Sequence, residues 1–209
     1  MGDWSPIFMM ARISKKKQED VRAALLEAAA DAFARDGLDA ARIDAIAVAA
    51  GYGKGTVYNY FASKTELFGA VIEEAARSAA ERYAAIASAP STRGQLLALA
   101  QADVSVARDR PGFVKVLVRE AMSFRPSTYG MIVKHLAPYV IAVERVIADG
   151  QVRGEVRTDR PSEQLALLFV GLLSLHYVQH WGSDGDWPTL DEIPELVTSA
   201  FWDGAAAPR

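Results

Sequence analysis

Apolar side chains recur at three- and four-residue steps along most of the chain, and this spacing is typical of amphipathic helices. The first clear stripe predicts a helix over residues 18–35 and consists of Val21, Leu25, Leu26, Ala29 and Phe33. Asp36-Gly37 follows and ends the helix, because glycine tolerates the backbone conformations that close a helix. No alternating pattern of useful length, as a half-buried strand requires, is present. The pattern therefore predicts an all-α fold.

Proline and glycine divide the rest of the chain into further helical segments. We expect a short helix from about residue 43 to 50, a second over 54–61, a long one from Ser63 to about 88, and then helices over 91–109, 112–124, 127–150, 161–181 and 189–203. Ser63-Lys64-Thr65-Glu66 matches a capping box, in which Ser caps the helix and Glu occupies its third position. Pro138 and Pro194 fall inside predicted helices, where we expect kinks.

The stretch from Ala41 to Lys64 predicts two short helices joined by the turn Gly51-Tyr52-Gly53. Val57 and Phe61 are four residues apart and can both point inward on the second helix. That leaves its polar side chains outside, namely Lys54, Thr56, Tyr58, Asn59 and Tyr60. A two-turn helix of this chemistry fits a DNA major groove, which is about 12 Å wide and presents donors and acceptors on its base edges. The alternative is a helical hairpin whose polar face is only solvated.

Composition restricts the class of protein further. The 209 residues are 51% hydrophobic and 23% charged, as in an ordinary globular protein of one or two domains. Cysteine is absent, which excludes disulfides and thiolate metal sites. No signal peptide pattern and no uncharged apolar run of roughly 20 residues is visible, so we expect a soluble cytoplasmic protein without a membrane partner.

The net charge of −3 is unusual for a nucleic-acid binder. Residues 1–66 nevertheless carry nine Lys or Arg against nine Asp or Glu, and 67–209 carry 14 against 17. The cations of the first part are placed before the first helix, at Lys15–Lys17, and within the hairpin. The Lys15–Lys17 run is either a solvated tail or an arm that touches the DNA backbone. So few cations predict specific binding by a dimer rather than strong non-specific binding by a monomer.

The hairpin and its flanks resemble the N-terminal signature of the tetracycline-repressor (TetR) family of transcriptional regulators. The resemblance covers roughly residues 21–71 and rests on Gly37-Leu38, Ile46-Ala47, Ala50-Gly51, Gly55-Thr56-Val57-Tyr58, Tyr60-Phe61 and Lys64. It implies a homodimer that binds a roughly palindromic operator with one recognition helix per half-site. Pro6 and the lysine run predict a flexible N-terminal arm over 1–17, and the resemblance implies a helix-turn-helix DNA-binding domain over 18–66 and a helical ligand-binding and dimerisation domain over 67–209.

The resemblance also implies roles for individual residues. Lys54, Gly55 and Thr56 would open the recognition helix beside bases or phosphates. The remaining candidates are Tyr58 and Lys64 for phosphate, Asn59 and Tyr60 for operator sequence, and Arg42 beside the second helix. Tyr58 can instead be a half-buried strut between helices. Two positions depart from the family pattern, because Ala41 and Gly53 stand where hydroxyl residues usually cap the second helix and the recognition helix.

The C-terminal part predicts a ligand site with less detail. The stretch 112–124, followed by Pro126 and by the pattern from Ile147 to Gly154, is similar to the C-terminal domain of AefR-like regulators. Candidate residues for an apolar cavity with a few polar tips are Phe113, Leu117, Met122, Phe124, Met131, Tyr139 and Tyr177. Each of them can also be plain core. The sequence does not name the effector, which we expect to be a small apolar or amphipathic molecule.

Segment 161–181 is apolar nearly all round, so we expect it to be buried on several sides. Together with the last helix it can form a four-helix bundle across a twofold axis, and the predicted dimer interface consists of Leu168, Gly171, Leu172, Leu175, Val197 and Phe201.

His176 and His180 have a spacing compatible with a metal, but a third ligand and an intervening Glu are missing, so no metal, cofactor or catalytic residue is predicted. The favoured function is a DNA-binding regulator, a repressor released from its operator by the effector, and not an enzyme. The alternatives are a helical small-molecule carrier that does not read DNA and a metal enzyme that uses His176 and His180.

Overall fold

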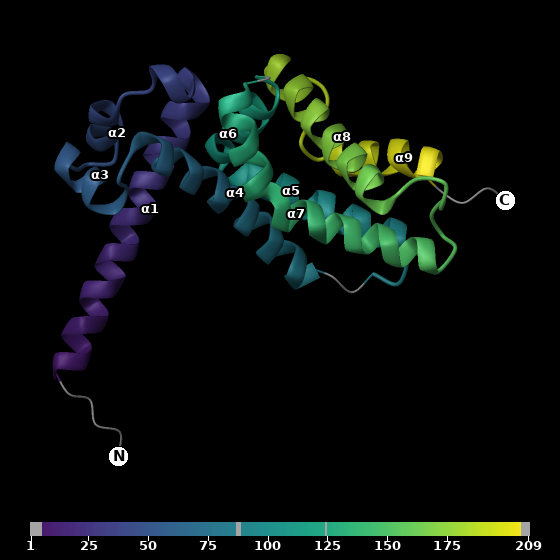
Figure 1. Ribbon diagram of the computed structural model, residues 1–209, viewed down its shortest axis with the longest axis horizontal. Coiled ribbons are helices and arrows are strands. Elements are labelled where there is room, and N and C mark those ends of the chain that lie inside the picture. The colour runs from purple at the N-terminus through teal and green to yellow at the C-terminus, as the bar shows by residue number, and fades with distance from the viewer. Residues whose placement is uncertain (1–5, 87–88, 124, 206–209) are drawn as a thin grey trace. The chain divides into compact units, whose positions relative to one another are not determined.

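A computed structural model describes residues 6–86, 89–123 and 125–205 of the chain (Figure 1). All regular structure in these ranges is helical except for isolated turns, as the sequence predicts. The helices are α1 (Pro6–Ala40), α2 (Ile43–Ala49), α3 (Lys54–Tyr60), α4 (Lys64–Ile86), α5 (Thr92–Asp109), α6 (Pro111–Ala121), α7 (Pro126–Val152), α8 (Ser162–Gly182) and α9 (Ile193–Ala205). The chain divides into two compact units, residues 1–71 and 72–209.

The first unit packs α1, α2, α3 and the start of α4 around one apolar core. The largest fully buried side chains of this core are Leu25, Leu26, Phe33, Ile46, Leu67 and Phe68. The rings of Phe33 and Phe68 meet edge to face with centroids 5.1 Å apart, a favoured aromatic geometry. The unit extends to Val71, five residues beyond the expected boundary, because the apolar face of the first turns of α4 belongs to this core.

Helix α1 begins much earlier than the sequence pattern predicts. Residues 6–17 were expected to be a flexible arm, yet they form the first turns of a helix that continues to Ala40. Pro6 suits a first helical position, where no N–H partner is needed, and the Met, Ala, Arg and Lys residues after it have good helix propensity. Residues 1–5 of the expected arm lie outside the described residues. The predicted end of the stripe is confirmed, because Gly37 breaks the helical path with φ of 77°.

Helix α4 carries the expected cap in a modified form. The Ser63 hydroxyl accepts a hydrogen bond from the Glu66 N–H at 3.0 Å, as in a capping box. The Glu66 carboxylate accepts from the N–H of Ala62 at 2.7 Å, one residue earlier than the usual partner. Both bonds satisfy backbone donors that no intrahelical carbonyl reaches, which fixes where α4 starts.

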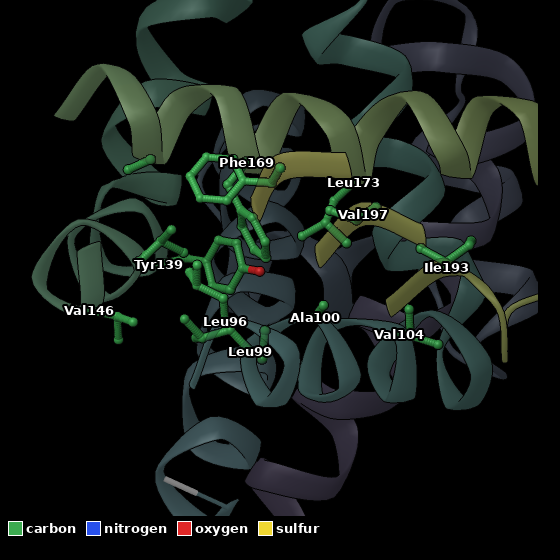
Figure 2. Close-up of a cluster of buried hydrophobic side chains, with 14 of the residues drawn as sticks. Leu96, Leu99, Ala100, Val104, Tyr139, Val146, Phe169, Leu173, Ile193 and Val197 are labelled. Atoms are coloured by element: carbon green, nitrogen blue, oxygen red, sulfur yellow. The ribbon is translucent and has the colours of Figure 1, made fainter. Parts of the chain in front are cut away.

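The second unit contains helices α5 to α9 and most of α4. Its core is formed by side chains from α5, α7, α8 and α9 that point toward one another, with Leu96, Leu99, Tyr139, Phe169, Leu173, Ile193 and Val197 among them (Figure 2). Phe169 and Phe201 add an edge-to-face pair with centroids 5.3 Å apart. The predicted bounds of these helices agree with the structure to within four residues.

The two internal prolines differ in their effect. Helix α7 runs through Pro138 as a continuous element, and Pro138 has no N–H to offer the carbonyl of Lys134. The expected mild kink at Pro194 is wrong, because α9 begins at Ile193 and Pro194 occupies its first turn. A proline is tolerated there since the first turn has no N–H partner to lose.

Helix α8 has two unlike faces, so the expectation that it is buried on several sides is wrong. Leu165, Phe169, Leu173 and Tyr177 are buried in the core at four-residue steps. The opposite face leaves apolar side chains exposed, namely Leu167, Leu168, Leu175 and Val178. Within the described ranges, α8 is the one helix long and apolar enough to cross a bilayer, but its core face packs against α7 and α9 as in a core helix.

Candidate functional site

The predicted helical hairpin is present and is fixed from its buried side. Helices α2 and α3 are joined by a turn in which Gly51 has φ of 79°, a conformation that favours glycine. The N–H of Tyr52 donates to the carbonyl of Ala47 at 2.9 Å and closes the end of α2. Ile46 and Val57 anchor the two helices in the core, with side chains 0% and 1% exposed. The arrangement holds seven-residue α3 rigidly although so short a helix would not persist alone.

The outer face of α3 carries the polar residues that the sequence predicts. Lys54, Gly55, Tyr58 and Asn59 are exposed, while Thr56 and Tyr60 are partly exposed. Tyr58 is 47% exposed, which is compatible both with a contact to DNA and with a half-buried strut between helices. The face therefore offers an ammonium, hydroxyls and an amide together, all within two turns.

Gly55 has no structural need to be glycine in the free protein. A Cβ built at this position would meet nothing within 4 Å, and the backbone has an ordinary helical φ. A glycine inside a helix lowers stability by roughly 0.5–1 kcal/mol relative to alanine. The missing side chain leaves open space beside the backbone of α3.

The cations around the hairpin are placed differently from the expectation. Lys54 forms an ion pair with Asp44 of α2 at 3.1 Å, and both side chains are about half exposed. The Lys64 ammonium donates to the backbone carbonyls of Asp39 at 2.8 Å and Ala41 at 3.1 Å. Lys64 thus holds the α1–α2 connection in place, and the pattern alone did not show that use.

The cap positions also need one correction. The N-cap of α2 is Arg42, with φ of −109° and ψ of 126°, and not Ala41, whose side chain is buried. Arg42 is exposed at the start of α2 and has no ion-pair partner among the described residues. Gly53 is the N-cap of α3, as expected, and offers no side-chain bond to the helix. Arg42 thereby brings a free guanidinium next to the backbone donors of α2.

The second unit contains a small cavity of about 40 Å³ among α4, α5, α6, α7 and α8. Its described lining consists of Ala75, Ala76, Ala79, Asp103, Val114, Leu117, Val118, Ala121, Leu136, Tyr139, Val170, Leu173, Ser174 and Tyr177. Of the predicted ligand residues, Leu117, Tyr139 and Tyr177 line it. Phe113, Met122 and Met131 do not, because Phe113 is buried in the core, with Arg110 over its ring, and Met122 is 41% exposed. Phe124 lies outside the described residues.

Asp103 is the residue of this cavity that sequence reasoning missed. Its Oδ2 accepts a hydrogen bond from the Tyr177 hydroxyl at 2.8 Å, across 74 positions of sequence. Burial raises the pKa of Asp103 from 3.8 to about 6, and the Tyr177 bond opposes that shift. Burial and the nearby Asp103 charge raise the pKa values of Tyr139 and Tyr177 well above 10. A signal existed, because Asp103 interrupts the apolar stripe of α5 at helical spacing from Leu96 and Leu99.

The two histidines of α8 have partners that account for them. His176 Nδ1 lies 2.7 Å from the carbonyl oxygen of Leu172, and His180 Nδ1 lies 2.8 Å from that of Pro188. The part of the chain that the structure describes holds no group of three potential metal ligands.

The predicted dimer surface is partly corrected. Leu168, Gly171 and Leu175 lie on the exposed face of α8, and Leu172 is partly exposed. Val197 and Phe201 are 0% and 2% exposed because they point into the core of the second unit, so they cannot contact a partner. The sequence assigned the apolar stripe of α9 to a partner, whereas this stripe packs in the core of its own unit.

A three-helix unit in which a glycine turn joins a buried helix to a short, exposed polar one defines a helix-turn-helix DNA-binding protein. Residues 25–71 match the family described as bacterial regulatory proteins, tetR family. The N-terminal unit of the chain is therefore similar to the DNA-binding domain of this family. The HTH-type transcriptional repressor SCO4008 of Streptomyces coelicolor is 28% identical over 160 residues, which are 77% of this chain and 80% of that protein.

Solved structures share the fold over nearly their whole length. The fatty acid degradation regulator FadR of Bacillus halodurans has a TM-score of 0.78 at 18% identity, covering 87% of this chain and 98% of that one. The transcriptional regulator FadR of Bacillus subtilis, solved in complex with stearoyl-CoA, has a TM-score of 0.77 at 17% identity, with the same coverage. These likenesses extend the fold assignment to the C-terminal helices, while the AefR-like subtype stays a prediction.

Proposed function

We propose that the protein is a homodimeric transcriptional repressor that α3 anchors to operator DNA and that a small molecule bound in the C-terminal unit releases. The observation that carries the proposal is the exposed polar face of α3, a helix that is anchored in the core through its buried side. The residues that would contact DNA are Arg42, Lys54, Gly55, Thr56, Tyr58, Asn59 and Tyr60. The Lys64 ammonium already donates to two backbone carbonyls, so only its third N–H would be available to a phosphate.

The chemistry of this face suits both parts of DNA recognition. Asn59 can pair with adenine, and Thr56 can contact a thymine methyl group. Tyr58 and the exposed cations Arg42 and Lys54 suit phosphate oxygens, which position a protein on the duplex without reading sequence. The absence of a side chain at Gly55 lets the DNA backbone come close to α3.

The exposed face of α8 supports dimerisation. Leu168, Gly171, Leu175 and Val178 follow one another at steps of three and four, opposite to the buried face. No charged residue occurs on α8 after Glu163, so two such faces can meet without burying a charge. A Cβ at Gly171 would meet no atom within 4 Å, so a second helix has room to approach the backbone closely at this position. A stable dimer of this kind buries about 1,200–2,000 Å².

Helix α4 provides a route from the cavity to the DNA-binding unit. Its first residues belong to the first unit, and Ala75, Ala76 and Ala79 line the cavity of the second. We propose that an effector in the cavity moves α4 and α7 and favours a dimer whose two recognition helices no longer match their half-sites. An effector acts in this way only to the extent that it binds the two states with different affinity.

The test is a fluorescence-anisotropy titration of the full chain against DNA from its own upstream region and against sites enriched from a random-sequence pool. We expect sequence-specific binding that weakens steeply with salt. Thr56→Ala/Tyr58→Ala should lower affinity at least about tenfold, since good base and phosphate contacts each contribute on the order of 1–3 kcal/mol. Gly55→Ala should also weaken binding while it leaves the free protein as stable or slightly more stable.

A matched control is Tyr129→Ala/Thr158→Ala, which removes the same two side-chain types from exposed positions of the second unit. It should bind DNA as the unaltered protein does. If no sequence is enriched, or if the α3 variants bind as well as the control, the proposed function is wrong and the carrier alternative takes its place.

A further inference from the structure

We propose that the effector of the C-terminal cavity is a slender apolar molecule with a cationic amine, and that Asp103 is the residue that recognises the amine. This inference rests on the proposed function, because it names the chemical class of ligand for the same cavity. Three features of the cavity support it: its charge, its unused hydrogen-bonding groups and its shape.

Asp103 gives the cavity its charge. Among the described lining residues it is the one carboxylic acid, and none of the others is Lys, Arg or His. The rest of the lining is apolar apart from Ser174 and two tyrosine hydroxyls. An anionic ligand would bring a second negative charge next to Asp103 with no cation to offset it, at a buried place where such repulsion is strong. A cation there would be paired instead.

The hydrogen-bonding groups of the cavity are only partly used. Tyr177 donates to Oδ2 of Asp103, and no other described residue bonds to this carboxylate, so Oδ1 remains available as an acceptor. The Tyr139 side chain is 4% exposed, and its hydroxyl is buried without a partner although it lines the same cavity. Such orphaned polar atoms are uncommon in native structures. Ser174 is engaged, since its hydroxyl donates to the carbonyl of Val170 at 3.0 Å. An ammonium has three donors, which can serve Oδ1 and the oxygen of Tyr139 together.

The shape of the cavity favours a narrow body. Its volume of about 40 Å³ holds at most a few water molecules, so a ligand must push the walls apart. Three alanines of α4 form one wall, and Leu136 lies two residues before Pro138, where α7 lacks a backbone hydrogen bond. A flexible alkyl chain requires less widening at this place than a fused ring system does.

The test uses hexylamine, hexanol and hexanoate, which share a six-carbon chain and differ in the head group. Isothermal titration of the full chain at pH 7.5 should show saturable binding of hexylamine, weaker binding of hexanol and the weakest binding of hexanoate. Asp103→Asn keeps the shape of the side chain and removes its charge, so it should weaken hexylamine binding at least about tenfold and leave hexanol binding nearly unchanged. Tyr139→Phe should weaken hexylamine binding less, because it removes one neutral acceptor.

The matched control is Asp203→Asn, an exposed carboxylate of α9 outside the cavity lining, and it should leave all three affinities unchanged. The inference is overturned if none of the three probes binds saturably, if hexanoate binds as tightly as hexylamine, or if Asp103→Asn retains full affinity for the amine. DNA binding is measured on the same preparations. Intact operator binding without amine preference overturns this inference alone, whereas loss of sequence-specific DNA binding overturns the proposed function.

Discussion

At the scale of single residues, some polar side chains of the cavity lower the stability of the fold in the place where a ligand is proposed to bind. Asp103 is the clearest case, because a carboxylate placed in an apolar cavity lowers the stability of the fold when it is ionised. Tyr139 repeats the situation with a buried hydroxyl that has no partner. Residues of this kind are typical of functional sites, where stability is given up for binding.

Asp103 makes a specific prediction about stability and pH. Its pKa is about 6 in the folded protein and near 3.8 when unfolded, so between these values the folded state binds more protons than the unfolded state. The free energy of unfolding therefore falls as pH rises from about 4 to about 6, and the loss is complete above that range. Asp103→Asn should be more stable than the unaltered protein by about 1–3 kcal/mol at pH 7.5.

Urea unfolding followed by circular dichroism at pH 4, 5, 6 and 7.5 measures this difference. The advantage of Asp103→Asn should shrink toward pH 4, where the folded state is protonated and the unfolded state is about half protonated. The titratable groups that face Asp103 are Tyr139 and Tyr177, and both stay neutral across this range because their pKa values are raised well above 10. Asp203→Asn should show no pH-dependent gain. An Asp103→Asn variant less stable than the unaltered protein at pH 7.5 would contradict the assignment.

At the scale of the helices, sequence reasoning succeeded wherever local rules decide the outcome. The helices of the second unit could be predicted to within four residues from caps, from proline and glycine positions and from apolar spacing. The same rules predicted the hairpin of α2 and α3 and its exposed face. Sequence reasoning failed where contacts between distant segments decide. The pairing of Asp103 with Tyr177 is one example, and the two carbonyls that hold Lys64 are another. The start of α1 was missed for a different reason, because residues 7–17 join an apolar cluster to a run of three lysines and so show no helical stripe.

The junction of α5 and α7 illustrates what distant contacts add. Gly154, with φ of 73°, ends α7, and the N–H of Glu155 donates to the carbonyl of Gly150 at 2.9 Å. The Glu155 carboxylate accepts from the Thr92 N–H and from Arg153, which lowers its pKa to about 2. Gly150 packs directly on Thr92, so the start of one helix fixes the end of the other.

Gly150→Ala is therefore expected to destabilise the protein. A Cβ at this position would lie 2.5 Å from Thr92 Oγ1 and 2.9 Å from Val156 Cγ2, distances that real contacts do not reach. We expect a loss of about 1–3 kcal/mol in the free energy of unfolding, measured by urea denaturation. Gly130→Ala is the matched control in the same helix, since a Cβ there meets nothing within 4 Å, and it should be neutral or slightly stabilising. Equal effects of the two substitutions would show that Gly150 has no packing role.

At the scale of the whole molecule, the exposed apolar face of α8 is the surface that the proposed dimer would cover. The apolar pattern of this helix runs all round because one face packs in its own unit and the other remains uncovered. Leu167, Leu168 and Leu175 are exposed on a helix that carries no charge after Glu163, and such a surface is typical of a protein interface. A second copy of the same face satisfies it by twofold symmetry, and a dimer is also what two half-sites of an operator require.

Leu168→Glu/Leu175→Glu is expected to separate the dimer without unfolding the chain. Both side chains are more than half exposed, so glutamate at these positions meets water in the monomer, but in the dimer it would be buried without a partner. Sedimentation equilibrium should show a monomer, with helicity unchanged and operator affinity reduced. Val152→Glu, on an 87% exposed residue of α7, should remain dimeric. Phe201→Ala is expected to behave in the opposite way. Removal of this core side chain should lower the free energy of unfolding by about 3–5 kcal/mol, and the folded protein should remain a dimer. A double glutamate variant that still sediments as a dimer would place the interface elsewhere on the molecule.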